Sequence, residues 1–164
     1  MQNMFLEIDG LKGESTSEQG KDQIEILSYS HGVSMPLTFG SSNTSRAHGR
    51  CTHQDFTVSK YLDLASPTLN AYCSGGSNIA KITLHVFKAD SITGKPVEFM
   101  KYILENVIVT SVAVGGSGGD QPTETVTLNY TKVAWEYIQQ KHPEKGGDAG
   151  TASTSWDLSK NVEK

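Results

Sequence analysis

Cysteine is scarce in this sequence, and its scarcity narrows the class of protein. Only Cys51 and Cys73 occur in 164 residues, too few for the dense disulfide framework of a small secreted scaffold. One bridge between them is arithmetically possible, but we expect two free thiols. A chain of this length corresponds to one domain and can bury a sizeable core without a cross-link.

Long apolar runs and an excess of basic residues are also missing. No stretch reaches about 18 consecutive apolar residues, the length that spans a membrane, and the first residues lack the basic and long apolar regions of a signal peptide. The 14 Lys and Arg against 18 Asp and Glu give a formal charge of −4, and an acidic surface repels phosphate groups. We therefore expect no nucleic-acid partner, no membrane insertion and no cleavable signal peptide.

Small hydroxyl residues and glycine are abundant instead. The sequence has 18 Ser, 15 Thr and 16 Gly, with 36% apolar and 20% charged residues. This composition is typical of short strands joined by turns. We predict a mainly β domain over residues 1–140.

Apolar alternation predicts the strands. Residues 79–87 alternate apolar and polar side chains, as in a half-buried strand. Residues 98–114 carry apolar side chains on both parities, which implies burial on both faces, either by a core and a helix or by a core and a partner subunit.

The alternation changes phase in two places, near residues 26–27 and near residues 131–132. A bulge or sharp bend at each place would reconcile the two halves of the strand. Strands that change face at a bend either close a barrel or join two packed sheets.

Three other segments have their own signals. Residues 66–75 have those of the one substantial helix, with Ser66 as N-cap, Pro67 in the first turn and glycine after the end. Residues 39–50 are polar and without periodicity, which predicts a protruding loop. Residues 141–164 are polar and glycine-rich, and we expect a flexible C-terminal tail whose end docks through Trp156.

The sequence contains residue types that can bind metals, bind phosphate or act in catalysis, but their spacing does not match the motifs of such sites. His48, Cys51 and His53, with Cys73 and His85 further on, are metal-ligand types, but their spacing matches no zinc module. Residues 115–119 are glycine-rich but lack the Lys of a phosphate loop, and there is no Gly-x-Ser-x-Gly nucleophile elbow. We expect a binding or assembly module with no enzymatic activity, no metal and no cofactor.

The order of several short segments resembles the Hcp family, the haemolysin-coregulated proteins of bacterial type VI secretion. The segments are FLEIDGLKGES at 5–15, IEILSYSHGV at 24–33, QDFTVSKYLD at 54–63, ASPTL at 65–69, VTSV at 109–112, GGSGG at 115–119, PTE at 122–124 and residues 133–140. Each is common alone, and their fixed order makes the resemblance specific. One position departs from the family pattern, because His31 stands where a second aromatic residue is usual.

The resemblance implies a closed β-barrel of two packed sheets with one flanking helix. It also implies a hexameric ring, stacked with other rings into a tube that a contractile sheath drives out of the cell. Such a tube contacts spike and baseplate proteins and carries small effectors in its lumen. The subunit would be assembled in the bacterial cytoplasm and secreted.

The resemblance also assigns roles to two segments. The strand over residues 22–33 would face the lumen, and its polar parity makes Ser28 and Ser30 the expected effector-contacting residues, with Tyr29 pointing to the core. The protruding loop would make the contact between rings. Its expected contact residues are Ser41, Ser42, Asn43, Thr44, Ser45 and Arg46.

Two other classes of protein remain open. One is a free-standing β-sandwich that binds a carbohydrate or another ligand in a cleft between loops, in the manner of a lectin. The other is a small hydrolase with His31 or His53 as its base, for which the sequence offers no nucleophile motif. The mass of the particle in solution separates a ring from both.

Overall fold

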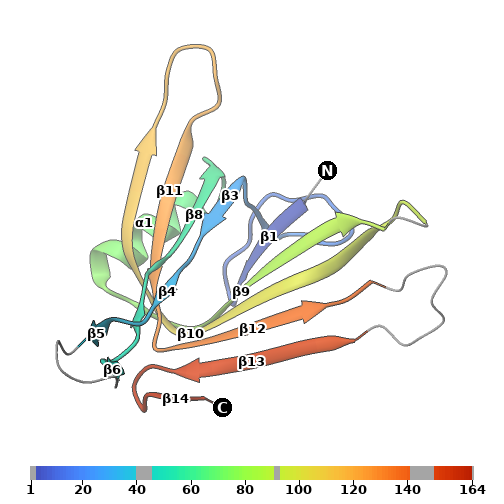
Figure 1. Ribbon diagram of the computed structural model, residues 1–164. Coiled ribbons are helices and arrows are strands. Elements are labelled where there is room, and N and C mark those ends of the chain that lie inside the picture. The colour runs from blue at the N-terminus through green and yellow to red at the C-terminus, as the bar shows by residue number, and fades with distance from the viewer. Residues whose placement is uncertain (1–2, 40–45, 91–92, 141–149, 164) are drawn as a thin grey trace.

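The computed structural model describes residues 3–39, 46–90, 93–140 and 150–163, which form a mainly β structure (Figure 1). The described strands are β1 (Asn3–Ile8), β2 (Ile24–Glu25), β3 (Ser28–Ser30), β4 (Val33–Ser34), β5 (Leu37–Phe39), β6 (Arg46–His48), β7 (Thr52–His53), β8 (Phe56–Tyr61), β9 (Asn78–Ala89), β10 (Pro96–Gly115), β11 (Thr123–Asn129), β12 (Lys132–Ile138), β13 (Thr151–Asp157) and β14 (Val162–Glu163). The one helix of the described residues is α1 (Ser66–Gly75). The predicted mainly β class with one helix is confirmed.

The 20-residue strand β10 joins two walls of one ten-stranded antiparallel sheet. Its first part pairs with β9 on one side and β12 on the other, and its last part pairs with β11. In Figure 1 the two parts run in different directions, so that β3, β8 and β11 form one wall and β9, β12 and β13 form the other. The apolar core lies between them and includes Phe56, Val58, Val126 and Leu128 from the first wall, and Ile82, Leu84, Val86 and Val133 from the second.

Two irregularities in β10 explain its apolar residues on both parities. Leu104 is buried on the even parity, whereas Val107 and Val109 are buried on the odd parity. Between them Asn106 has a φ of 56°, and the pairing with β11 shifts register after Val109. The double pattern therefore reflects in part a change of phase toward one core. Ile108 is 39% exposed in the single chain, so its burial by a partner subunit stays a prediction.

The closed barrel is not confirmed, because no sheet in the described part of the chain closes on itself. Closure would require one continuous strand that pairs with both β1 and β8. Residues 24–30 are instead divided into two strands, β2, which pairs with β1, and β3, which pairs with β8. The division falls at the predicted bend. The Ile26 amide donates to the Met4 carbonyl at 3.0 Å, whereas the Leu27 amide donates to the Ser59 carbonyl at 2.7 Å.

The residue predicted as the N-cap of α1, Ser66, hydrogen-bonds to a buried ion pair and does not cap the helix. Ala65 is the N-cap residue, and it makes no side-chain capping bond. The Ser66 hydroxyl donates instead to Glu124 Oε1 at 2.7 Å, and Lys60 Nζ lies 2.5 Å from the same oxygen. A carboxylate taken out of water must be paired and hydrogen-bonded, so this pair takes the hydroxyl that a cap would have used. At the other end Gly76 ends the helix with a φ of 61°, as predicted.

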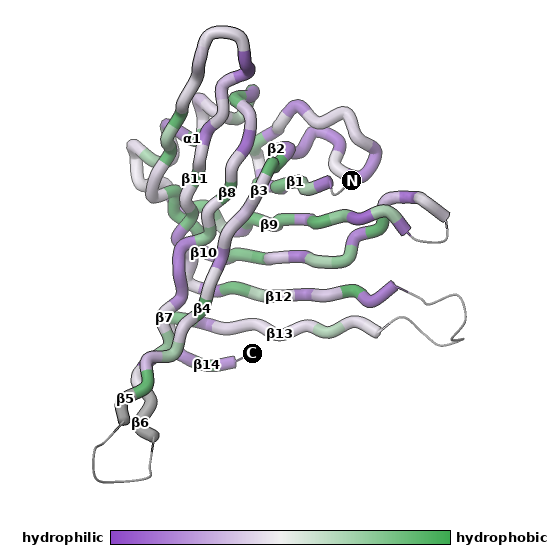
Figure 2. Tube along the Cα trace, turned by 45° about the horizontal axis from the view of Figure 1, so that its top comes forward, coloured by the Kyte–Doolittle hydropathy of each residue, from purple (hydrophilic) through white to green (hydrophobic). Residues whose placement is uncertain are grey.

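The predicted loop over residues 39–50 is in part a hairpin. β5 pairs with β6 through Leu37, opposite His48, and β4 pairs with β7. We call the described part of this two-part hairpin, residues 33–39 and 46–53, the arm. It projects from the end of the molecule opposite to the β10–β11 turn (Figure 2). Residues 41–45 lie outside the described residues.

The last described segment is a strand and not a flexible tail. β13 pairs with β12 along its whole length, from Lys132 opposite Asp157 to Ile138 opposite Thr151. Its sequence hides this role, because Thr, Ala and Ser alternate without an apolar face until Trp156. Trp156 does pack against the core.

Candidate functional site

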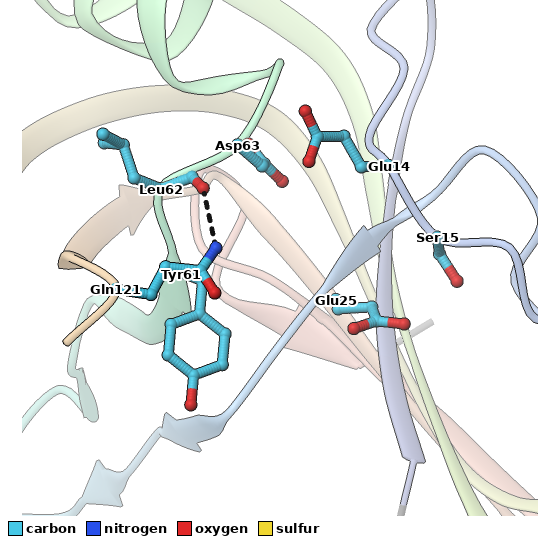
Figure 3. Close-up of a pocket in the computed structure, with 7 residues that line it drawn as sticks. All are labelled: Glu14, Ser15, Glu25, Tyr61, Leu62, Asp63 and Gln121. Atoms are coloured by element: carbon cyan, nitrogen blue, oxygen red, sulfur yellow. Dashed lines mark hydrogen bonds between the residues drawn. The ribbon is translucent and has the colours of Figure 1, made fainter. Parts of the chain in front are cut away.

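A polar pocket lies where the end of β8 meets the segment before β2 (Figure 3). Its volume is about 290 Å³, and it is lined by Glu14, Ser15, Glu25, Tyr61, Leu62, Asp63 and Gln121. The Ser15 hydroxyl accepts a hydrogen bond from the Ser17 amide. Three carboxylates, those of Glu14, Glu25 and Asp63, line the pocket, and its lining includes no histidine or lysine.

Small hydroxyl side chains cover the outer face of the first wall. Ser28 and Ser30 are exposed and lie opposite residues of β8, which lie opposite residues of β11. Directly paired residues of antiparallel strands share a face. The row, which we call the hydroxyl face, consists of Ser28, Ser30, Thr57, Ser59, Thr125 and Thr127.

The side chain between the two serines points to the other face, as predicted. Tyr29 packs against the core, with its ring stacked on Phe56 at 5.9 Å and its hydroxyl 3.4 Å from that of Tyr102. The sequence identified two of the six residues of the hydroxyl face. The other four were visible as alternation within β8 and β11, but the register that aligns the strands was not.

Seven rings meet where the arm joins the body. We call them the root cluster, and they are His31, His53, Phe56, Tyr102, Tyr130, Trp135 and Trp156. The His31 ring lies 5.4 Å from Phe56, 5.7 Å from Tyr130 and 6.1 Å from Trp135, between ring centroids. His31 therefore occupies a place for an aromatic ring. The sequence could not show this cluster, because its members come from five separated segments.

Burial lowers the pKa of both histidines of the root cluster. It is the main cause for His31, where the nearby His53 lowers the pKa further and a hydrogen bond to the Gln54 carbonyl opposes the shift. It is the only resolved cause for His53. Burial also raises the pKa of Tyr102 and Tyr130. The cluster thus favours neutral rings.

Two apolar patches are exposed at opposite ends of the molecule. The arm patch consists of Val33, Met35 and Leu37, which are 47%, 48% and 45% exposed. The end patch lies where β8 ends and consists of Tyr61, Leu62 and Leu64, which are 43%, 40% and 65% exposed. Figures 1 and 2 both place the end of β8 away from the arm.

A third apolar surface lies on the second wall. A groove of about 330 Å³ is lined by Met100, Trp135, Tyr137, Ala152, Ser153 and Thr154. Tyr137 is 44% exposed there, and its ring meets Phe99 at 6.4 Å. The groove continues the core-facing side of β12, so that apolar surface extends beyond the core.

Metal ligands do not gather in the described part of the chain. Within it, no group of three His, Cys, Asp or Glu side chains could hold a metal ion. Cys51 and Cys73 are both free thiols. Among the described residues, α1 is too short and too polar to cross a membrane.

Known proteins have the same fold and a similar sequence. The profile of the family described as "Type VI secretion system effector, Hcp" matches residues 5–137. Protein hcp1 of Pseudomonas aeruginosa PAO1 is 34% identical over 162 residues, which cover 98% of each chain. The crystal structure of Hcp1 from Salmonella typhimurium superposes with a TM-score of 0.81 at 30% identity, covering 99% of both chains. A structure described as that of a type six secretion system protein superposes with a TM-score of 0.89 at 28% identity, covering all of both chains.

Fold and sequence thus define a mainly β protein of the type VI secretion apparatus. The chain belongs to the Hcp family.

Proposed function

We propose that this chain is the tube subunit of a type VI secretion system. Copies close into a hexameric ring, rings stack head to tail, and the lumen carries small effectors that are secreted with the tube. Sheath, spike and baseplate proteins are the proposed partners outside the ring. Membership of the Hcp family supports this function, which requires no reaction chemistry.

The observation that carries the stacking is the pair of apolar patches at opposite ends. A soluble chain that exposes apolar side chains in groups generally covers them with a partner. Because the arm patch and the end patch are different surfaces, the arm patch of one copy can cover the end patch of the next. Such a head-to-tail contact forms an open stack when the rotation between copies does not close into a ring, which is the arrangement that we propose. We propose that Ser41 to Ser45 and Arg46 take part in this contact.

Lateral contacts within a ring are assigned to the groove on β12 and β13. The groove exposes the apolar side chains of Met100 and Tyr137 beyond the core, on a face other than the two ends. A neighbour seated there would remove Tyr137 from water. Lateral and axial contacts then use separate surfaces, so one can be disrupted without the other.

The hydroxyl face is the proposed wall of the lumen. Ser28 and Ser30 lie in a row of six hydroxyl residues with no charged member. A wall of this kind offers weak hydrogen bonds to varied cargo without a fixed charge pattern that would select one partner. This supports Ser28 and Ser30 as effector-contacting residues.

The mass and shape of the particle test the proposal. We expect wild-type protein to give a hexameric mass in light scattering and stacked rings in electron micrographs at high concentration. Leu64→Gln, in the end patch, should keep the hexamer and lose the stacks. Val162→Gln is the matched control, because Val162 is 43% exposed on β14 outside both patches, and it should change neither property. A monomeric wild type, or Leu64→Gln rings that stack normally, contradicts the proposal.

A further inference from the structure

The root cluster puts two histidines at the point where the arm enters and leaves the body. His31 lies two residues before β4, and His53 is the last residue of β7, opposite Val33. Both strands of the arm therefore pass a histidine as they reach the body. Neither the proposed ring nor the proposed tube explains why titratable rings stand here among aromatic ones.

Among the described residues, few hydrogen bonds hold the arm to the body, and most involve this cluster. The Tyr130 hydroxyl contacts both strands, because it donates to the Gln54 carbonyl at 3.1 Å and lies 3.3 Å from His31 Nδ1. Next to the arm, the Gln54 amide donates to the Gly32 carbonyl at 2.9 Å. Outside the root cluster, the Arg50 guanidinium donates to the Leu158 carbonyl. The packing of the two imidazoles thus forms a large part of the attachment.

The hydrogen bonding suits neutral imidazoles. His31 Nε2 and His53 Nδ1 are buried without a partner among the described residues. A neutral imidazole has one bare nitrogen that needs no acceptor, whereas an imidazolium must donate from both. His31 Nδ1–H can donate to the Tyr130 oxygen while that hydroxyl donates to Gln54. Protonation would add a buried N–H with nowhere to donate, which is costly.

The other titratable groups around the root cluster do not neutralise the positive charge that a protonated His31 or His53 would carry. Asp55 accepts a hydrogen bond from Asn129 at 2.8 Å, and its charge acts on Tyr130. Cys51 also helps to raise the pKa of Tyr130, and the Tyr29 hydroxyl contacts that of Tyr102. Neither histidine of the root cluster makes an ion pair in the described part of the chain. His85 on β9, by contrast, contacts both Glu7 and Glu98.

We propose that His31 and His53 form an acid-sensitive latch for the arm. When both are neutral, their rings pack in the root cluster and hold the arm against the body. When both are protonated, they repel each other, His31 Nε2 and His53 Nδ1 need acceptors that the described residues do not supply, and the arm is released. Histidine is the side chain suited to such a switch near neutral pH.

The direction of the pH dependence follows from linkage. In the latched form the pKa of each histidine lies below its ordinary value of 6.5, and in the released form it returns toward that value. The released form therefore binds protons more tightly. The latch has its full stability above pH 6.5 and loses it as the pH falls. If both histidines take up a proton, the opening equilibrium rises by up to about 100-fold per pH unit.

The two tryptophans report on His53 directly. Trp135 and Trp156 are the only tryptophans in the sequence, and their rings lie 6.3 and 6.4 Å from that of His53. We would titrate the full chain from pH 7.5 to 5.0 and follow tryptophan emission. Amide hydrogen exchange of residues 33–37 and 50–54, corrected for the intrinsic rate, would be measured in parallel. We expect quenching by the imidazolium and exchange in the arm at least about tenfold faster at pH 5, with β9 unchanged.

Two variants decide the cause. The double variant His31→Phe with His53→Phe keeps rings that cannot take a charge and should lose the acid response of the arm. His85→Gln, which removes a histidine outside the cluster, should keep it. If the double variant misfolds, His31→Phe alone should lower the slope of the response from two protons to one. An arm of the double variant that opens with acid like the wild type, or a wild type without a transition in this range, overturns the latch. So does β9 exchanging together with the arm.

The proposed latch and the proposed tube can be contradicted independently of each other. The particle mass measured on the same samples reports whether rings form, while the arm is followed within each chain. A protein that never forms rings can still show the acid response, and a protein that forms rings can lack it.

Discussion

Removing the ammonium of the buried ion pair should destabilise the subunit strongly. Lys60 and Glu124 are both 0% exposed in their side chains. Lys60 Nζ lies 2.5 Å from Glu124 Oε1, 2.8 Å from Asp63 Oδ1 and 3.1 Å from Ser66 Oγ. Lys60→Met keeps most of the side-chain volume but leaves the Glu124 carboxylate buried without a counter-charge. Glu124 Oε2 already has no hydrogen-bond partner among the described residues, so the neutral Ser66 hydroxyl, on Oε1, is the partner that remains.

The expected magnitude follows from the fate of the unpaired carboxylate. Breaking a fully buried pair by removing one partner costs about 3–5 kcal/mol. For a chain of this size, that loss lowers the melting temperature by about 6–20 °C. Replacing both partners, in Lys60→Met with Glu124→Leu, removes the buried charge and should recover most of the loss.

Urea unfolding at a fixed protein concentration measures the effect. The concentration must be fixed because assembly adds to apparent stability by mass action. Lys12→Met is the control, since Lys12 pairs with Asp22 at 3.6 Å with side chains 76% and 53% exposed, and it should cost less than about 1 kcal/mol. A Lys60→Met variant that loses less than 1 kcal/mol, or a double variant that loses the sum of both single changes, would refute the reasoning.

Two further predictions concern β3 and a buried glycine. Tyr29→Gln should cost about 1–3 kcal/mol by thermal melting, because it removes the ring contact with Phe56, whereas Ser30→Gln should leave stability unchanged and reduce effector retention; the reverse order would show a misassigned face. Gly20→Ala should cost about 1–3 kcal/mol, because its Cβ would lie 2.3 Å from the Phe5 ring. Gly118→Ala meets nothing within 4 Å and should be neutral, so equal melting temperatures for the two glycine variants would refute the packing argument.

The sequence predicted the parts of the fold that depend on local alternation. The bend at Ile26 and Leu27 was located to the residue, because a period-two pattern shows a change of phase directly. β13 and the β5–β6 hairpin were missed for the opposite reason. Their side chains are mostly small or polar, and pairing with a neighbouring strand, which leaves no trace in their own sequence, makes them strands.

The candidate surfaces could likewise be predicted only where they depend on a local pattern in the sequence. Ser28 and Ser30 could be assigned to a face from parity alone, but the rest of the hydroxyl face needs the register of β3, β8 and β11. Ser66 shows the limit of a local signal. Its position fits an N-cap, yet Glu124, 58 residues away, takes its hydroxyl. Contacts between distant segments also assemble the root cluster, so the pattern around His31 and His53 could not show it.

The shared strand β10 has a consequence for how force passes through a subunit. Side-chain contacts alone would let one wall slide over the other under load. Here the two walls are also joined through the backbone of a single strand, which pairs with β9 and β12 in one and with β11 in the other. A push on either wall therefore travels along covalent bonds and a continuous ladder of hydrogen bonds. We expect each subunit to transmit an axial thrust as a stiff body, with compliance confined to the arm.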